Sequence, residues 1–310
     1  MPNFVDCSVF HPVQSPAEKQ ALRASLGLPP DAFIVGCVAA VKKDHKRIDY
    51  LIHEFALYYN GGEARRRNFF EQKHAKHAKE ENGFSAEGGE ENSSLRSSRA
   101  SVQNSSLFLP YLLIAGAKTS ETAELLALAE SLIPGRYKIL TDCSRARMPE
   151  LLRAMDVFVL TSLFEMMPIA VLEALASGLP CLVNQHPVLE WMVGCGGDVL
   201  DVSCETLDVN RSEEKNVTPL TTHVSRLTSH PSPPASHVSR LTSHISPLPG
   251  GMSIDMNRPG ALAQALAGLT PEWIAEHGRQ ARARALQMFS KEAVIAQYVE
   301  YYKIIMKDEV

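Results

Sequence analysis

The sequence predicts an α/β protein built on a doubly wound parallel sheet. Short apolar runs rich in β-branched residues recur along the chain, and segments with helical spacing or helix-start signals separate them. Parallel strands are buried on both faces, so they look like continuous apolar stretches rather than alternating ones. Ligands of such sheets bind over the carboxyl ends of the strands, so we expect chemistry in the loops that follow the strands.

The elements follow one another in a regular order. After an opening segment without periodicity, a helix is expected from Ser15-Pro16 to about Gly27, then a buried strand at 33–38. A basic loop at 42–47 leads into a helix with apolar residues at helical spacing from Ile48 onward. Further strands are expected at 111–115, 137–140, 157–160, 180–184 and 253–255, and helices at 121–132, from 149, and at 168–177, 259–266, 271–288 and 291–306. This alternation indicates right-handed crossovers in one sheet.

Two stretches, at about 60–106 and 199–252, do not look like core. The first is rich in Ser, Gly, Lys and Glu, and the second, rich in Pro, Ser, Thr and His, repeats residues 223–230 at 237–244. Few side chains there can bury apolar area, so ordering them would cost entropy with little return. Two short copies are also too few for a solenoid. We therefore predict a single domain over residues 1–310 with two disordered insertions.

Composition excludes several classes of protein. The 310 residues are 45% hydrophobic and 21% charged, with a formal net charge of −4, which is globular and a poor match to nucleic-acid binding. No apolar run reaches the roughly 18 residues needed to cross a bilayer, and the start lacks the pattern of an export signal. The six cysteines form no CxxC pair and no metal-ligand spacing. The sequence predicts a cytoplasmic protein without a transmembrane segment, a disulfide framework or a metal.

Two carboxylates stand eight positions apart in the segment 161–174. Glu165 lies in the loop after a strand, and Glu173 lies in the next helix, whose first turn suits Pro168. The amides and dipole of a helix N-terminus favour an anion, and a carboxylate accepts hydrogen bonds from paired sugar or ribose hydroxyls. Alone, this spacing is common, and the plainer interpretation is a solvated loop glutamate and a helix-surface glutamate.

This segment resembles the E-x7-E element of glycosyltransferase family 4, also called group 1, whose members have the GT-B fold. Other parts of the chain resemble the same family in order and spacing. They are residues 2–12, 46–52, 114–116, 154–159 and 176–180. The resemblance covers nearly all of the chain outside the two insertions. It implies one Rossmann-like half of a GT-B fold, the donor-binding C-terminal half, with the N-terminal acceptor domain absent from this chain.

The resemblance also implies roles for single residues. Glu173 would bind the ribose of a nucleotide sugar, Glu165 a hydroxyl of the transferred sugar, and Lys46 the leaving diphosphate. Cations aimed at a leaving group that gains negative charge lower the barrier. The expected catalytic residues are Glu165 and Lys46, and the expected donor-binding residues are Lys42, Lys43, Gly116, Met167, Pro168, Ile169 and Glu173. No metal or other cofactor is expected, because these enzymes generally need none and the chain has no DxD-like cluster.

The chain departs from the family pattern near both ends of this site. Val41 stands where the family usually has an arginine, so Lys42 or Lys43 must substitute with a point charge that lacks the bidentate fork. Met166 and Met167 follow Glu165 where the family often has Phe-Gly, so a bulky side chain replaces a residue that allows close approach of the sugar.

The sequence therefore predicts transfer of a sugar, hexosyltransferase-like and with retention, from a UDP-, GDP- or ADP-linked donor to an unknown acceptor. This activity requires an acceptor-binding half, for which a separate chain is one source. The alternative is a non-catalytic or degenerate nucleotide-sugar-binding domain. A third hypothesis is a GT-B-like sugar-nucleotide epimerase, which the opening segment and the E-x7-E order disfavour. The C-terminal helix would pack on the absent half, which leaves Tyr298, Tyr301 and Tyr302 exposed here.

Overall fold

The computed structural model describes residues 3–62, 109–194 and 245–308. Most of the insertions predicted at about 60–106 and 199–252 lies outside these residues. Both predicted ranges are too wide at one end, because residues 60–62 continue a helix and residues 245–252 contain a strand and the start of the next.

Seven strands form one sheet in the order β3-β2-β1-β4-β5-β7-β6. They are β1 Phe33–Val38, β2 Pro110–Gly116, β3 Tyr137–Thr141, β4 Val157–Leu160, β5 Cys181–Asn184, β6 Ile245–Leu248 and β7 Gly251–Ile254. All neighbours are parallel except β6 and β7, which form an antiparallel edge. The chain order reverses between β1 and β4, which is where sheets of this kind bind ligands. The predicted doubly wound fold is confirmed.

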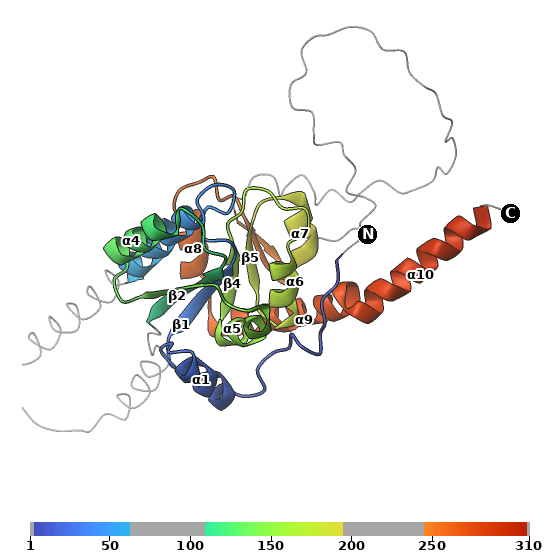
Figure 1. Ribbon diagram of the computed structural model, residues 1–310, viewed down its shortest axis with the longest axis horizontal. Helices are drawn as coiled ribbons and strands as arrows, with labels where there is room; N and C mark the ends of the chain where they lie inside the picture. The colour runs from blue at the N-terminus through green and yellow to red at the C-terminus, as the bar shows by residue number, and fades with distance from the viewer. Residues whose placement is uncertain (1–2, 63–108, 195–244, 309–310) are drawn as a thin grey trace, which may run out of the picture.

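Helices cover both faces of this sheet (Figure 1). They are α1 Pro16–Ser25, an unlabelled helix at 48–62, α4 Thr122–Leu132, α5 Met148–Ala154, α6 Ile169–Ala176, α7 Pro187–Val193, α8 Ala261–Ala267, α9 Pro271–Arg284 and α10 Lys291–Asp308. One apolar core joins the sheet to α5, α6, α7 and α9, and a second joins it to helix 48–62, α4 and α8. Strand side chains alternate between them, so Ile34 packs in the first core and Val35 and Cys37 pack in the second.

A partly buried ion cluster joins the amino ends of β1 and β4. The Asp156 carboxylate accepts hydrogen bonds from Lys19 Nζ at 2.7 Å, from Arg23 Nη2 at 2.6 Å and from the Ile34 amide at 2.7 Å. Arg23 is only 5% exposed and also donates to three backbone carbonyls, among them that of Ala154. The cluster ties α1 to the sheet at the edge opposite the loops where ligands are expected.

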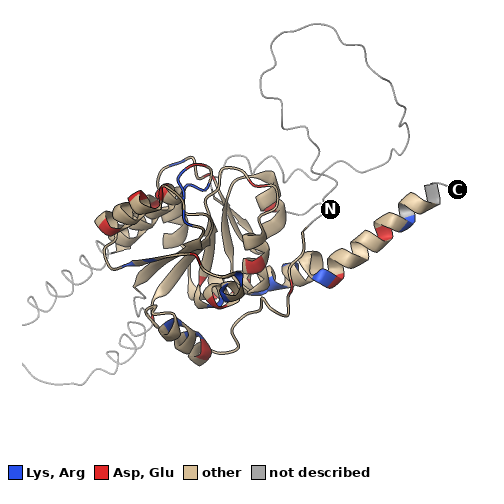
Figure 2. Ribbon diagram, viewed as in Figure 1, with Lys and Arg blue, Asp and Glu red and all other residues tan. Residues whose placement is uncertain are grey.

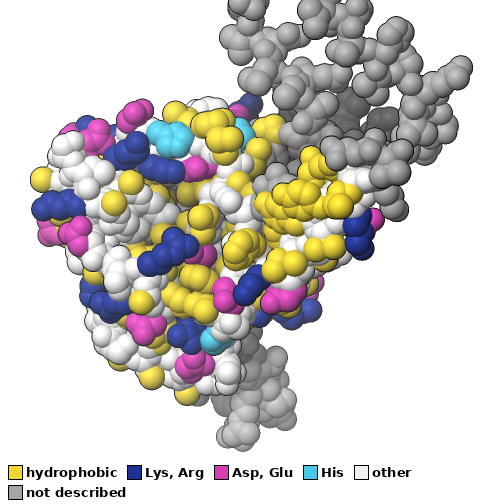
Figure 3. All heavy atoms as spheres, turned by 45° about the vertical axis from the view of Figure 1, so that its right-hand side comes forward, with side chains coloured by type: hydrophobic (Ala, Val, Ile, Leu, Met, Phe, Trp, Pro, Cys, Tyr) yellow, Lys and Arg dark blue, Asp and Glu magenta, His cyan; other side chains and the backbone are white. Residues whose placement is uncertain are grey.

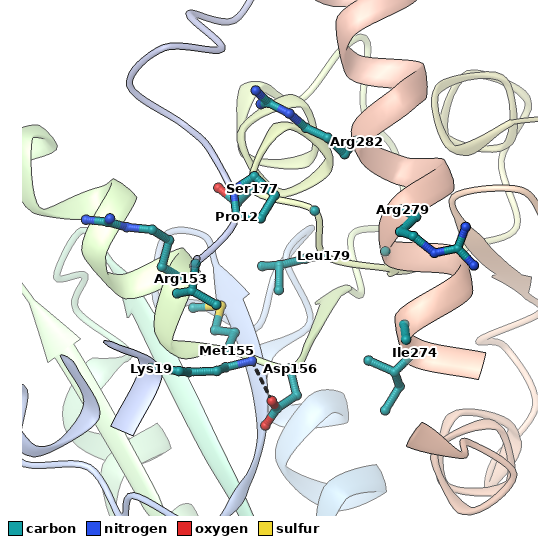
Figure 4. Close-up of a pocket in the computed structure, with 14 residues that line it drawn as sticks. Pro12, Lys19, Arg153, Met155, Asp156, Ser177, Leu179, Ile274, Arg279 and Arg282 are labelled. Atoms are coloured by element: carbon teal, nitrogen blue, oxygen red, sulfur yellow. Dashed lines mark hydrogen bonds and ion pairs between the residues drawn. The ribbon is translucent and has the colours of Figure 1, made fainter. Parts of the chain in front are cut away.

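A cavity of about 340 Å³ lies beside this cluster, between α9 and the segment that leads into α1 (Figure 4). Three arginines line it, Arg153, Arg279 and Arg282, and their charged ends are turned away from the space around Leu179 (Figure 4). Arg153 pairs with Glu18 at 3.3 Å, and Arg282 donates to the carbonyls of Phe10 and Ala176, among others. These groups cross-link the chain, so the cavity is a gap in structural packing.

Helix α10 extends away from the rest of the molecule (Figure 1) and carries apolar side chains on its surface (Figure 3). Tyr301 and Tyr302 are more than half exposed, as the sequence predicts, whereas Tyr298 is half-buried. None of the helices in the described ranges is long and apolar enough to cross a membrane. The same ranges contain no group of three or more His, Cys, Asp or Glu side chains that could hold a metal ion.

Candidate functional site

Lys46 and Glu165 meet where the order of the strands reverses. Lys46 lies in the basic loop after β1, and Glu165 lies in the loop after β4. The Lys46 ammonium forms an ion pair with the Glu165 carboxylate, and these side chains are 20% and 12% exposed. His45 Nε2 lies 3.9 Å from the same carboxylate. The structure thus brings together the two residues that the sequence assigns to catalysis.

Glu173 lines a neighbouring cavity of about 390 Å³ over the carboxyl ends of β1, β2 and β3. Its lining residues are Val38, Gly116, Ala117, Asp142, Cys143, Arg145, Met148, Ile169, Ala170 and Glu173. Glu173 is 4% exposed, and its carboxylate accepts a hydrogen bond from Arg145 Nη2 at 3.0 Å. Burial raises the pKa of the Glu173 carboxyl, and the Arg145 guanidinium opposes that rise.

The ion pair and the cavity adjoin but are not one hollow. Glu173, Gly116 and Ile169 line the cavity, whereas Lys46 and Glu165 lie outside its lining, at the ends of β1 and β4. The loop between Glu165 and Ile169 joins the two parts. Both belong to the carboxyl edge of the sheet, so a ligand long enough to reach both would cross from β2 to β4.

Other predicted site residues make different contacts. The Lys43 ammonium pairs with Glu124 at 2.7 Å, and the Lys43 amide donates to the Glu121 carboxylate. Both glutamates belong to the α4 region, whose acidic residues are visible in Figure 2. Lys43 is therefore directed toward α4 rather than toward Glu165. Lys42 is half-buried. Val41 is fully buried in the second core, and its amide continues the pairing between β1 and β2 by donating to the Ala117 carbonyl.

The residues after Glu165 are held by the start of the chain. The Asn3 amide donates to Met167 Sδ at 3.0 Å, and Asn3 Nδ2 donates to the Met167 carbonyl at 3.2 Å. Met166 is 80% exposed, and Pro168 caps α6 rather than lying within its first turn. The side chain of Met167 therefore contacts the opening segment of the chain and packs against the first core.

Close packing requires a glycine at position 116, which the sequence analysis did not predict. A Cβ at this position would lie 1.7 Å from the carbonyl oxygen of Ala39, which crosses close above β2. A glycine here is what lets the loop that carries Lys46 leave β1 in this direction.

Alanine at 116 is expected to lower the free energy of unfolding by about 1–3 kcal/mol, because the backbone of Ala39 must move. Urea unfolding measures the change. Gly268→Ala is the matched control, since a Cβ there meets its nearest neighbour at 3.5 Å, an ordinary contact. Equal losses in the two variants would contradict the packing explanation.

Two residues near the site escaped the sequence analysis. Arg145 follows β3 in a short 3₁₀ turn, Arg145–Arg147, and Thr161 directly follows β4. Thr161 is fully buried, and its hydroxyl donates to the Lys46 carbonyl at 2.7 Å. The rule that ligands bind at the carboxyl ends of strands is the signal that points to both, because each stands at such an end.

Comparison with known proteins finds a family model that matches the part of the chain with this site. Residues 110–198, which include Glu165 and Glu173, match the family described as "Glycosyl transferases group 1". The resemblance to the group 1 glycosyltransferases is confirmed. Among curated proteins, the chain is 58% identical over 40 residues to a UDP-Gal:alpha-D-GlcNAc-diphosphoundecaprenol alpha-1,3-galactosyltransferase of Escherichia coli. That match covers 13% of this chain and 10% of the relative.

Solved structures show the same fold at low identity. Sucrose-phosphate synthase of Thermosynechococcus elongatus aligns over 99% of this chain, with a TM-score of 0.58 and 17% identity. Anabaena Alr3699/HepE, in complex with UDP and glucose, aligns over 97% of this chain, with a TM-score of 0.56 and 15% identity. The chain spans 52% and 55% of those two proteins. It covers 99% of the C-terminal domain of a group 1 protein, LpcC of Francisella tularensis, with a TM-score of 0.51, 11% identity and 93% of this chain aligned. These likenesses support one Rossmann-like half of a GT-B fold.

Proposed function

We propose that this chain is the donor-binding, C-terminal half of a retaining family 4 glycosyltransferase, which transfers a sugar from a nucleotide-sugar donor to an acceptor. The observation that carries the proposal is the ion pair of Lys46 and Glu165 beside the cavity that holds Glu173. A buried carboxylate, a cation and a second carboxylate along one sheet edge match the order of ribose, diphosphate and sugar in such a donor.

Each residue has a defined task in this proposal. Glu173 accepts hydrogen bonds from the ribose hydroxyls in place of the one from Arg145. The Lys46 ammonium exchanges its partner Glu165 for the diphosphate and stabilises the charge that builds as the bond from the sugar to the diphosphate breaks. Glu165, freed from Lys46, accepts a hydrogen bond from a hydroxyl of the sugar.

The comparisons favour UDP over GDP and ADP as the nucleotide. Anabaena Alr3699/HepE is solved in complexes with UDP and with UDP-glucose, and the name of the E. coli relative specifies UDP-Gal. A UDP-linked hexose is therefore the donor that we test first.

The acceptor site would come from a second half of the GT-B fold. The chain spans 55% of Alr3699/HepE and nearly all of an isolated C-terminal domain, and α10 presents exposed Tyr301 and Tyr302 where such a half could pack. We also place the protein in the cytoplasm. Among the described residues, Cys7, Cys37, Cys143 and Cys181 are free thiols, which is typical of a reducing compartment.

Calorimetric titration with UDP, GDP and ADP tests the binding claim. We expect UDP to bind, and Lys46→Ala to weaken its affinity about 10- to 100-fold, the scale of one charged hydrogen bond. Lys291→Ala, at the exposed start of α10, is the control and should bind like the wild type. Equal affinity in the Lys46→Ala and control variants would remove Lys46 from the diphosphate site, and no binding of any nucleotide would refute the proposal.

The alternative hypothesis, a domain that binds nucleotide sugars without reaction, predicts the same affinities in this titration. Slow hydrolysis of UDP-glucose, in which water takes the glucose and UDP is released, separates the two hypotheses. We expect the wild type to release UDP and Lys46→Ala to lose this activity, because departure of the diphosphate needs the cation.

A further inference from the structure

Lys46 lies between two residues with an unfavourable backbone. His45 and Arg47 have φ angles of 64° and 53°, in the left-handed region that favours glycine. Residues with a Cβ keep this conformation only where surrounding contacts hold it. The direction in which Lys46 points therefore depends on what holds residues 45–47.

The loop after β4 holds all three residues by their carbonyl groups. Thr161 Oγ1 donates to the Lys46 carbonyl at 2.7 Å, with the Arg47 carbonyl 3.3 Å away. The Leu163 amide donates to the His45 carbonyl at 2.9 Å. Thr161 is fully buried, so water does not replace its hydroxyl as a donor.

The same loop also carries the partner of the Lys46 side chain. Glu165 stands four positions after Thr161, and its carboxylate pairs with the Lys46 ammonium. The Lys46 amide donates to the Asp44 carbonyl within its own loop, whereas its carbonyl and its ammonium both meet the segment after β4, across the point where the strand order reverses. A lysine side chain is long and flexible, so anchoring its backbone limits where the charge can go.

We propose that Thr161 is a positioning residue: its hydroxyl holds the left-handed loop so that the Lys46 ammonium reaches the diphosphate of the donor. This inference rests on the proposed function of Lys46. It concerns a contact between residues 115 positions apart in the sequence.

Thr161→Val keeps the shape of the side chain and removes the donor, and Thr161→Ser keeps the donor. We expect Thr161→Val to weaken UDP affinity about tenfold, the scale of one buried hydrogen bond, and Thr161→Ser to restore it. In the Lys46→Ala background, Thr161→Val should cause no further loss, because its effect passes through Lys46. Thermal unfolding of each variant checks that the fold is intact.

A second measurement needs no nucleotide. Acylation of Lys46 by an amine-reactive reagent and amide hydrogen exchange over 44–47, both read by mass spectrometry, should speed up in Thr161→Val but not in Thr161→Ser. Unchanged rates would overturn the inference even if UDP does not bind. An equal loss of affinity from Thr161→Val with and without Lys46 would also overturn it. If Lys46→Ala alone leaves UDP affinity unchanged, the proposed role of Lys46 is wrong. This inference, which rests on that role, is then wrong as well.

Discussion

Alanine in place of Asp156 is expected to lower the free energy of unfolding by about 3–5 kcal/mol. The substitution leaves the Arg23 guanidinium, 5% exposed, without its carboxylate, and it removes an acceptor from the Ile34 amide. A buried charge without a partner pays its full desolvation cost, whereas the intact pair offsets much of it. Urea unfolding followed by circular dichroism measures the change.

Asp31→Ala is the matched control for this variant. Its carboxylate accepts a hydrogen bond from Gln20 at 2.9 Å on the exposed surface, so we expect a change within about 0.5 kcal/mol. A loss in Asp156→Ala as small as that of the control would mean that Arg23 finds another partner. The ion cluster would then not be what fixes α1 to the amino ends of β1 and β4.

The fold could be predicted because its strands differ sharply from their surroundings. The strands β1 and β4 have the bounds that the apolar runs at 33–38 and 157–160 predict. Each is central and buried on both faces, so every residue is apolar or small. The edge strand β6 was missed because it contains Ser246 and Pro247 and is defined by its antiparallel pairing with β7. A proline is tolerated there because an edge strand has fewer partners for its amide groups.

Only the part of the site that depends on local sequence spacing could be predicted. The spacing of Glu165 and Glu173 along one loop and one helix is a local pattern. The contacts of Arg145 with Glu173 and of Thr161 with Lys46 span 28 and 115 positions, and no periodicity encodes such pairs. Lys43 shows the same limit, since the family pattern suggested it for the diphosphate in place of the arginine, whereas its contact with Glu124 on α4 spans 81 positions.

Glutamine in place of Glu173 is expected to weaken the binding of UDP-glucose about 100-fold or more. The change removes the charge from a group proposed to accept two hydrogen bonds from the ribose, and hydrogen bonds to charged groups are the stronger ones. Isothermal titration calorimetry measures the affinity. Glu150→Gln, whose carboxylate pairs with Arg147 at 3.9 Å on the surface of α5, is the matched control and should bind like the wild type.

The pH dependence of the same titration tests how Arg145 and Glu173 work together. Burial raises the pKa of Glu173 above its usual value, so affinity that needs the ionised carboxylate is present above that raised pKa and is lost as the pH falls through it. Arg145→Ala removes the charge that opposes the rise, so we expect the loss of affinity to begin at a higher pH, and Arg145→Lys should keep the wild-type profile. UDP-glucose suits this experiment because its diphosphate, esterified at both ends, does not titrate in this range.

Glu173→Gln is also the control variant for the pH series. His186, whose pKa burial lowers, also lies near this site, and its contribution persists in the glutamine variant, whereas that of Glu173 does not. The difference between the two profiles is therefore the part that belongs to Glu173. Identical profiles in the wild type and in Glu173→Gln would mean that the ionisation of this carboxylate does not govern binding. Arg145 would then be a surface partner of Glu173, and the ribose would have to be held elsewhere along the carboxyl edge of the sheet.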